Sequence, residues 1–175
     1  LMPPAKLAGL IAAASVADTV MFKSPTSTQR DRRMADRMAR IANISLSELG
    51  KEIFSASISD DKPAETLLFT DFKDFHIADH DFGVSQITCI DSGRMMQRKD
   101  EFLQVMQKTM EERGYTLLIL MLTDVLLEGS QLLYLGDEDI ITQAFGVQLK
   151  DHTCFLPGIV SRKKQVIPSL TALWG

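Results

Sequence analysis

The sequence has few cysteines and no long hydrophobic run. Cys89 and Cys154 are its two cysteines in 175 residues, too few for a disulfide framework, so we expect both to be buried, reduced thiols. The apolar stretch at residues 7–17 stops at Asp18. It is shorter than the roughly 18 apolar residues of a membrane span and has no basic leader in front of it. We therefore expect a cytoplasmic protein without a membrane partner.

An excess of positive charge is also missing. The chain has 19 Lys and Arg residues against 23 Asp and Glu, which gives a net charge of −4. An acidic chain is a poor candidate for coating nucleic acid, so nucleic acid is not expected as a partner, although a local basic patch is compatible with this balance. A hydrophobic content of 45% over 175 residues is ordinary for a folded protein and fits one large domain or two small ones.

Most familiar catalytic motifs are absent. The sequence has no glycine-rich phosphate loop, no paired CxxC and no GxSxG motif. His76 and His80 are spaced four residues apart, but they fall in a predicted strand and turn, where this spacing does not place two imidazoles on one helical face. We do not expect a metal site there. His152 has no partner that the sequence identifies.

The first third of the chain is predicted to be helical. Pro3 and Pro4 suit the first turn of a helix that runs to about Ala17. This helix is apolar nearly all round, with Leu7 and Leu10 among its large residues. Such a helix needs burial against more protein than its short neighbours supply, which suggests that the chain begins partway through a longer protein.

Two further helices are expected before residue 57. The second is rich in arginine and has an apolar stripe at helical spacing, formed by Met34, Met38, Ile41 and Ala42. This pattern favours ordinary packing with a solvated arginine face over nucleic-acid binding. A capping-box sequence at residues 45–48 then predicts a third helix that ends near Ala56.

The polar segment at residues 57–62 is the predicted domain boundary. Beyond it the pattern becomes α/β, and the apolar run at residues 115–122 is typical of a central strand buried on both faces. Other strands are expected at residues 71–77, 82–90, 131–135, 147–149 and 154–160, and helices at residues 95–113, 137–145 and 168–174. The predicted fold class is α/β: a helical N-terminal segment, residues 1–60, followed by a mixed β-sheet domain flanked by helices, residues 61–175.

Two local features are candidates for chemistry. Arg162, Lys163 and Lys164 are consecutive cations between apolar segments. An arginine beside lysines combines paired hydrogen bonds with point charge, as a phosphate clamp requires, while an exposed basic loop is the alternative. Asp18 ends the first predicted helix, where the helix dipole disfavours a carboxylate. It is either a solvated terminus or a metal ligand.

Several ordered blocks of the sequence carry a family resemblance. They are residues 17–19, 22–26, 71–75, 85–87, 123–126, 128–130 and 157–165. With these blocks the chain resembles the C-terminal half of the family II, manganese-dependent inorganic pyrophosphatases of the DHH phosphoesterase superfamily. The run Ser161-Arg162-Lys163-Lys164-Gln165 is its most specific part, and the resemblance covers almost the whole chain.

The resemblance implies a two-domain enzyme that hydrolyses pyrophosphate to two phosphates in a cleft between a metal-binding domain and a substrate-clamping domain. Asp18 matches the last metal-binding aspartate of the first domain. Lys73, Arg162 and Lys163 match the cations that grip the phosphates, and Lys164 is a weaker candidate. The other metal ligands, including an Asp-His-His motif, would lie upstream of residue 1, and no catalytic residue is assigned within this chain.

The resemblance also implies cofactors and partners. Two Mn²⁺ ions would form the metal centre, Mg²⁺ would accompany the substrate, and the full-length protein would be a homodimer formed by its N-terminal domain. Residues 1–60 would be the helical end of the metal-binding domain plus a linker, and residues 57–63 a hinge for clamp closure. Because one carboxylate cannot hold two metals, we expect this chain alone to be inactive. The alternatives are a hydrolase of polyphosphate or another phosphoanhydride, and a non-enzymatic, anion-binding regulatory module.

Overall fold

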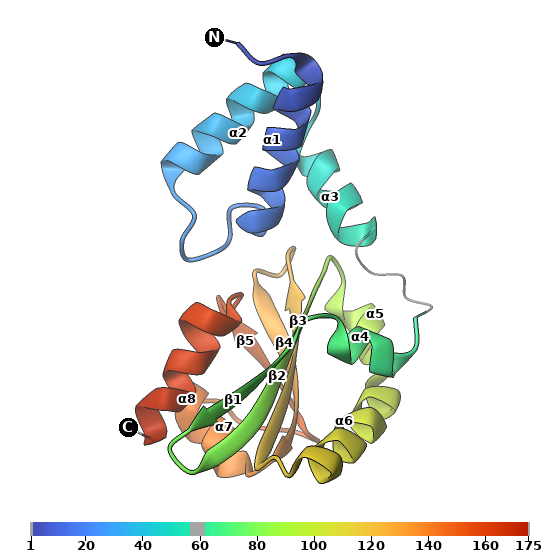
Figure 1. The fold of residues 1–175 in the computed structure, drawn as a ribbon, viewed down its shortest axis with the longest axis vertical. Coiled ribbons are helices and arrows are strands. Elements are labelled where there is room, and N and C mark those ends of the chain that lie inside the picture. Colours follow the sequence, from blue (N-terminus) through green and yellow to red (C-terminus); the bar gives the residue numbers. More distant parts are fainter. Residues whose placement is uncertain (1, 57–61, 175) are drawn as a thin grey trace. The chain divides into compact units, whose positions relative to one another are not determined.

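The computed structural model describes residues 2–56 and 62–174. The chain divides into two compact units, which we call the helical unit, Leu1–Ser59, and the sheet unit, Asp60–Gly175. Figure 1 shows helices in the first and a sheet with flanking helices in the second. The expected hinge falls largely on residues 57–61, which lie outside the described residues. Within the described ranges, no helix is both long and apolar enough to cross a membrane.

The helical unit contains three helices with local end signals. They are α1 (Ala5–Asp18), α2 (Gln29–Ala42) and α3 (Leu46–Ala56). A capping box starts α2: the Asp31 N–H donates to Thr28 Oγ1, and the Thr28 N–H donates to Asp31 Oδ2 at 2.8 Å. Asn43 ends α2 in the left-handed conformation, with φ 56°. The three predicted helices are confirmed.

The core of the helical unit is small. Ala8, Ala12 and Met38 are its buried cluster, because α1 and α2 pack through alanine-rich faces. Leu7 and Leu10 are 48% and 66% exposed within the described residues. Met34 is 45% exposed, so the prediction that it packs in the apolar stripe of α2 is wrong. The rest of the predicted stripe is in place, because Met38 is a member of the cluster and Ile41 and Ala42 pack against it.

The sheet unit is built on a mixed sheet of five described strands in the order β1-β2-β3-β4-β5. The strands are β1 (Phe72–Ile77), β2 (His80–Cys89), β3 (Leu117–Asp124), β4 (Gly129–Gly136) and β5 (Thr153–Pro157). The pair β2 and β3 is parallel, and the other pairs are antiparallel. The predicted fold class, a mixed sheet flanked by helices after a helical segment, is confirmed.

Helices cover both faces of this sheet (Figure 1). They are α4 (Ala64–Thr70), α5 (Ser92–Met96), α6 (Lys99–Arg113), α7 (Glu138–Phe145) and α8 (Ile167–Trp174). Every residue of β3 is buried, as predicted for a central strand. Ile119 and Met121 belong to the cluster that includes Ile141 of α7 and Leu170 of α8. Leu118, Leu120 and Leu122 alternate with these residues and face the opposite layer, where Phe102 of α6 is fully buried.

Several element boundaries differ from the predictions. Residues 147–149 are not a strand, and beside them a single bridge pairs Lys150 with Thr153. The strand expected at 154–160 ends at Pro157, because the chain turns through Gly158 at φ 74°. The helix expected at 95–113 is two helices, α5 and α6, separated at Gln97 and Arg98. Helix α4 was not expected.

Candidate functional site

One edge of the sheet collects the residues that the sequence singles out. The strand register pairs Phe72 with Ser85, Asp124 with Gly129, and Gly129 with Pro157. Cys89, which ends β2, pairs with Asp124, so the ends of β2, β3 and β5 and the start of β4 lie at the same edge. Strand β1 begins opposite Ser85, further inside β2. The chain after β5 continues from this edge into a short π-helix, η1 (Arg162–Val166).

The basic run forms this π-helix. Its first turn is capped by Ser161, whose Oγ accepts the Lys164 N–H at 3.3 Å, and the Val166 N–H donates to the Ser161 carbonyl. This turn buries Arg162 and leaves Lys163 and Lys164 exposed. Short π-helical turns are rare and occur often at functional sites.

Arg162 is anchored inside the sheet unit. Its Nη1 donates to the carbonyl oxygens of Asp71 at 2.6 Å and Val84 at 3.0 Å, and its Nη2 donates to Asp71 Oδ1 at 2.7 Å. The arginine side chain is 8% exposed, whereas the Asp71 side chain is half exposed. The reading as an exposed basic loop is therefore wrong for Arg162. Its Nε N–H and second Nη2 N–H make no bond among the described residues, so two donors are left for an anion.

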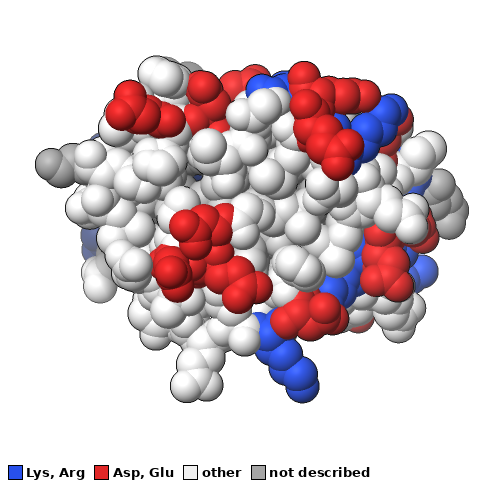
Figure 2. Space-filling view, turned by 90° about the horizontal axis from the view of Figure 1, so that it is seen from below, with Lys and Arg blue, Asp and Glu red and all other residues white. Residues whose placement is uncertain are grey.

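Lys73 is brought beside this arginine by the strand register. It is exposed on β1 and pairs with Val84 of β2, the residue whose carbonyl oxygen accepts from Arg162. The structure therefore gathers Lys73, Arg162, Lys163 and Lys164 at one sheet edge, which we call the basic edge. Figure 2 shows the sheet unit from the opposite end, where acidic side chains predominate. Asp71 also lies at the basic edge, where it pairs with Arg162, and the three lysines there are exposed. Exposed ammonium groups of this kind can bind an anion.

The loop at residues 158–161, which leads into η1, is held by side chains. Gln165 Oε1 accepts from the N–H groups of Val160 at 2.9 Å and Ser161 at 3.0 Å, and its Nε2 donates to the Gly158 carbonyl at 2.7 Å. Gln86 and Ser130 bond two further carbonyl oxygens of this loop. None of these three polar residues was predicted as a site residue. For Gln86 and Ser130 the signal is a polar side chain within an otherwise apolar strand, whereas Gln165 lies in η1.

Asp18 lies at the end of α1 and is exposed. The chain after it is strained, because Val20, Met21 and Phe22 have φ values of 50°, 52° and 65°. Left-handed φ values cost a non-glycine residue about 1–2 kcal/mol each. Buried Thr19 helps to hold this turn, since its Oγ1 accepts the Phe22 N–H at 3.0 Å. Backbone strain of this kind is concentrated at functional sites.

These described residues do not by themselves fit a metal centre. Within residues 2–56 and 62–174, no group of three or more His, Cys, Asp or Glu side chains lies together. Asp18 therefore offers one carboxylate, whereas a pair of divalent ions needs several oxygen or nitrogen ligands.

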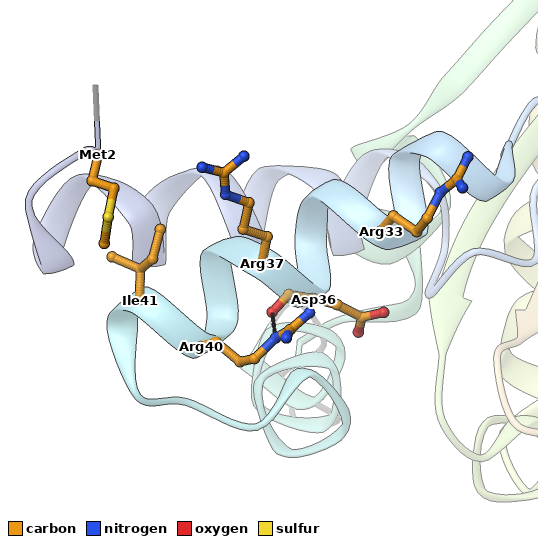
Figure 3. Close-up of a pocket in the computed structure, with 6 residues that line it drawn as sticks. All are labelled: Met2, Arg33, Asp36, Arg37, Arg40 and Ile41. Atoms are coloured by element: carbon orange, nitrogen blue, oxygen red, sulfur yellow. Dashed lines mark hydrogen bonds between the residues drawn. The ribbon is translucent and has the colours of Figure 1, made fainter.

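A second candidate is a cavity of about 460 Å³ in the helical unit. Figure 3 shows its lining from α2, with Arg33, Arg37 and Arg40 beside Asp36, and Met2 and Ile41 at one end. The arginines point in different directions: Arg40 turns back and its Nε donates to the Asp36 carbonyl at 3.3 Å, while Arg33 lies at the far end of the lining. These guanidinium groups do not converge on one point, so this cavity is the weaker candidate.

Pairing, ring stacking and burial account for His76, His80, Cys89 and Cys154. His76 Nδ1 lies 2.7 Å from Asp81 Oδ1, and the His80 ring stacks on Trp174 at 4.3 Å between centroids. Cys89 and Cys154 are both buried and form no disulfide among the described residues, as predicted. Burial raises the pKa of the Cys154 thiol to about 11, so it is protonated at neutral pH and a poor nucleophile.

Comparisons with known proteins show which family the sequence matches. The model of the DHHA2 domain family matches residues 51–173. A manganese-dependent inorganic pyrophosphatase of Methanocaldococcus jannaschii is 37% identical over 94% of this chain and 54% of its own length. A cobalt-dependent inorganic pyrophosphatase of Clostridium perfringens is 42% identical over 98% of this chain and 32% of its own length.

A solved structure is similar over nearly the whole chain. The crystal structure of a Methanococcus jannaschii protein assigned to the family II inorganic pyrophosphatases superposes with a TM-score of 0.84 at 35% identity. The match covers 99% of this chain and 57% of that protein. This chain therefore spans about half the length of that protein, as it does for the Methanocaldococcus jannaschii relative.

Proposed function

Because the chain belongs to the DHHA2 domain family, we propose that it is the substrate-clamping part of a manganese-dependent inorganic pyrophosphatase, an enzyme that hydrolyses pyrophosphate to two phosphates. The observation that carries this proposal is the basic edge, where buried Arg162 is anchored beside Lys73 and is followed by exposed Lys163. Residues 61–175 are then the substrate domain, and residues 1–60 are the helical end of the metal-binding domain plus a linker.

The cations have distinct tasks in this proposal. Lys73 and Lys163 supply mobile ammonium groups that bind phosphate oxygens as point charges. Arg162 keeps two N–H donors for the substrate while its other bonds hold the π-helix on the sheet. Lys164 is the weaker contributor. Phosphoryl transfer depends mainly on positioning and charge neutralisation, so these residues would bind the substrate and disperse the charge of its phosphates.

Asp18 supplies one metal ligand in this proposal. The centre of two Mn²⁺ ions is completed by residues outside this chain, and Mg²⁺ enters with the substrate. Bound divalent ions of this kind supply Lewis-acid charge and an activated water. Asp18 is the one metal ligand that we propose within the described residues. No catalytic step is therefore assigned to them, and this chain alone is expected to be inactive. The full-length protein is proposed to be a cytoplasmic homodimer.

The test measures phosphate release from magnesium pyrophosphate in the presence of Mn²⁺. It compares this chain with the full-length protein, and the full-length protein with its Lys73→Ala, Lys163→Ala and Lys108→Ala variants. Losing a charged hydrogen bond to substrate is expected to lower kcat/KM roughly 10- to 100-fold in the first two variants. Lys108 is an exposed lysine on α6 that pairs with Glu112, so Lys108→Ala is the matched control and should leave kcat/KM unchanged.

Three results would contradict the proposal. Activity of the isolated chain would show that the upstream ligands are not needed. Turnover of long polyphosphates in place of pyrophosphate would favour another phosphoanhydride hydrolase. An inactive full-length protein that still binds pyrophosphate would favour a regulatory, anion-binding module.

A further inference from the structure

Beneath the loop at residues 158–161, three polar side chains from three different strand positions form a continuous hydrogen-bonded chain. Gln86 Nε2 donates to Thr123 Oγ1 at 2.9 Å and to the Val160 carbonyl at 3.1 Å. Thr123 Oγ1 lies 2.9 Å from Ser130 Oγ, and Ser130 Oγ donates to the Ile159 carbonyl at 2.7 Å. The chain thus connects the central strands to the loop that precedes Arg162.

The direction of this chain follows from proton counting. A carbonyl oxygen only accepts, so the Ser130 hydroxyl donates its single proton to the Ile159 carbonyl oxygen. The proton between the two hydroxyls must then come from Thr123, which in turn accepts from the Gln86 amide. Each hydroxyl donates once along a single path, which we call the Gln86 relay: Gln86 to Thr123 to Ser130 to Ile159.

The surroundings leave the relay few alternatives. Thr123 and Ser130 are both fully buried, so a broken bond cannot be replaced by water without opening the core, and buried networks of this kind are stable only when every member is bonded. The relay also fixes two consecutive carbonyl groups, those of Ile159 and Val160. The main chain enters η1 two residues later, so these bonds and those of Gln165 together fix its path there.

We propose that Gln86, Thr123 and Ser130 are positioning residues for phosphate binding: the Gln86 relay holds the loop at residues 158–161 in the conformation that presents Arg162 and Lys163 to the substrate. This inference rests on the proposed function for the nature of the ligand. None of the three residues touches the substrate in this proposal, so they act through the loop.

The test compares Thr123→Val with Thr123→Ser in the full-length protein. Valine keeps the volume of threonine but removes the hydroxyl, which breaks the relay at its centre, while serine keeps the hydroxyl. Thr109→Val is the matched control, because Thr109 is a buried threonine whose hydroxyl donates to the Val105 carbonyl within α6. Ser130→Ala, which removes the donor to Ile159, replaces Thr123→Val if that variant does not fold.

Two readouts separate positioning from general stability. In Thr123→Val we expect faster amide hydrogen exchange at residues 158–166 and a KM for magnesium pyrophosphate raised about tenfold, with kcat changed less. Thr123→Ser should stay within about twofold of the original protein, since its hydroxyl preserves the relay. Thr109→Val should change neither readout.

Unchanged exchange at residues 158–166 in Thr123→Val would overturn the inference, whatever happens to KM. Faster exchange with an unchanged KM would also overturn it, because the loop would then move without affecting the substrate. If the unmodified full-length protein shows no turnover, the proposed function fails by itself. The inference is then decided by exchange together with the Kd for inorganic pyrophosphate, measured by calorimetry on the same variants.

Discussion

The two units of this chain bury very different side chains. The sheet unit encloses a strand that is buried along its whole length and large residues such as Phe82, Phe102 and Tyr134. The helical unit buries mainly alanines, and its large residues Leu7 and Leu10 are exposed within the described residues. Apolar area removed from water is the main stabilising term in folding. The sheet unit therefore has the core of an independent domain, whereas the helical unit does not.

The two units also differ in how they hold candidate functional residues. In the sheet unit, half-buried Gln86 and buried Ser130 bond the loop that precedes the cations, and Arg162 is itself fixed by three hydrogen bonds. In the helical unit, Asp18 is followed by a strained turn that is held by local bonds, among them the bond from the Phe22 N–H to Thr19. A binding surface supported by a large core can hold its conformation before the ligand binds. A single carboxylate needs further ligands to bind a metal ion.

The largest effect is expected when the units are separated. Residues 60–175 should unfold in urea in one cooperative transition, with a free energy of unfolding on the order of 5 kcal/mol or more. Residues 1–59 should lose most of their helical signal, because three short helices with an alanine-lined core are marginal in water. Far-UV circular dichroism measures both. A cooperative transition in residues 1–59 alone would contradict the comparison.

Adding one methyl group to a glycine should have opposite effects in the two units. Gly136 has φ 120°, and a Cβ there would lie 2.4 Å from the Thr116 carbonyl oxygen, so Gly136→Ala should destabilise the sheet unit by about 3 kcal/mol. Gly9 lies inside α1, where a Cβ would meet Ala42 at an ordinary 3.7 Å. Gly9→Ala should therefore stabilise the helical unit by roughly 0.5–1 kcal/mol.

The single tryptophan makes this pair of variants measurable in one chain. Trp174 belongs to the sheet unit, so its fluorescence follows only that unit during urea unfolding, while circular dichroism follows both. Gly136→Ala should shift the fluorescence transition, and Gly9→Ala should shift only the circular dichroism signal. A stabilised fluorescence transition in Gly136→Ala would show that the steric argument is wrong.

The smallest effect is a pH dependence at the start of α2. Hydrogen bonds from the Thr28 N–H and, second, from the Thr28 hydroxyl lower the pKa of Asp31 in the folded state. The capping contribution is therefore present above the ordinary carboxyl pKa and is lost as the pH falls through the lowered value. Thr28→Ala removes the hydroxyl bond, so it should raise the pKa of Asp31 partway toward its ordinary value, measured by carboxyl carbon NMR.

Glu101 serves as the internal control for that titration. A side-chain hydrogen bond from Arg98 lowers its pKa in the sheet unit, and Thr28→Ala should not change it. An Asp31 pKa that does not move in Thr28→Ala would mean that the hydroxyl does not donate to the Asp31 carboxylate.

Local signals determined the elements that could be predicted. The capping box at residues 45–48 and the apolar run of β3 are read from neighbouring residues, because helix starts and fully buried strands depend on short-range chemistry. Some predictions failed at element boundaries, and one failed where the packing of another helix decides which side chains are buried. Met34 was expected in a core because its spacing fits a stripe, but the face that α1 offers to α2 is formed by other positions.

The same distinction applies to the candidate site: some of its features follow from the local sequence, and others depend on contacts between distant segments. The sequence by itself determined the cluster of three cations, the sheet that supports it and the family resemblance that assigns it to phosphate. Only the tertiary structure decided that Arg162 is buried against Asp71 and Val84, and that the Gln86 relay supports the loop before it. These contacts join residues that are between 7 and 91 positions apart along the chain. Charge and periodicity are properties of a segment, but a hydrogen bond between distant segments exists only after the strands between them have paired.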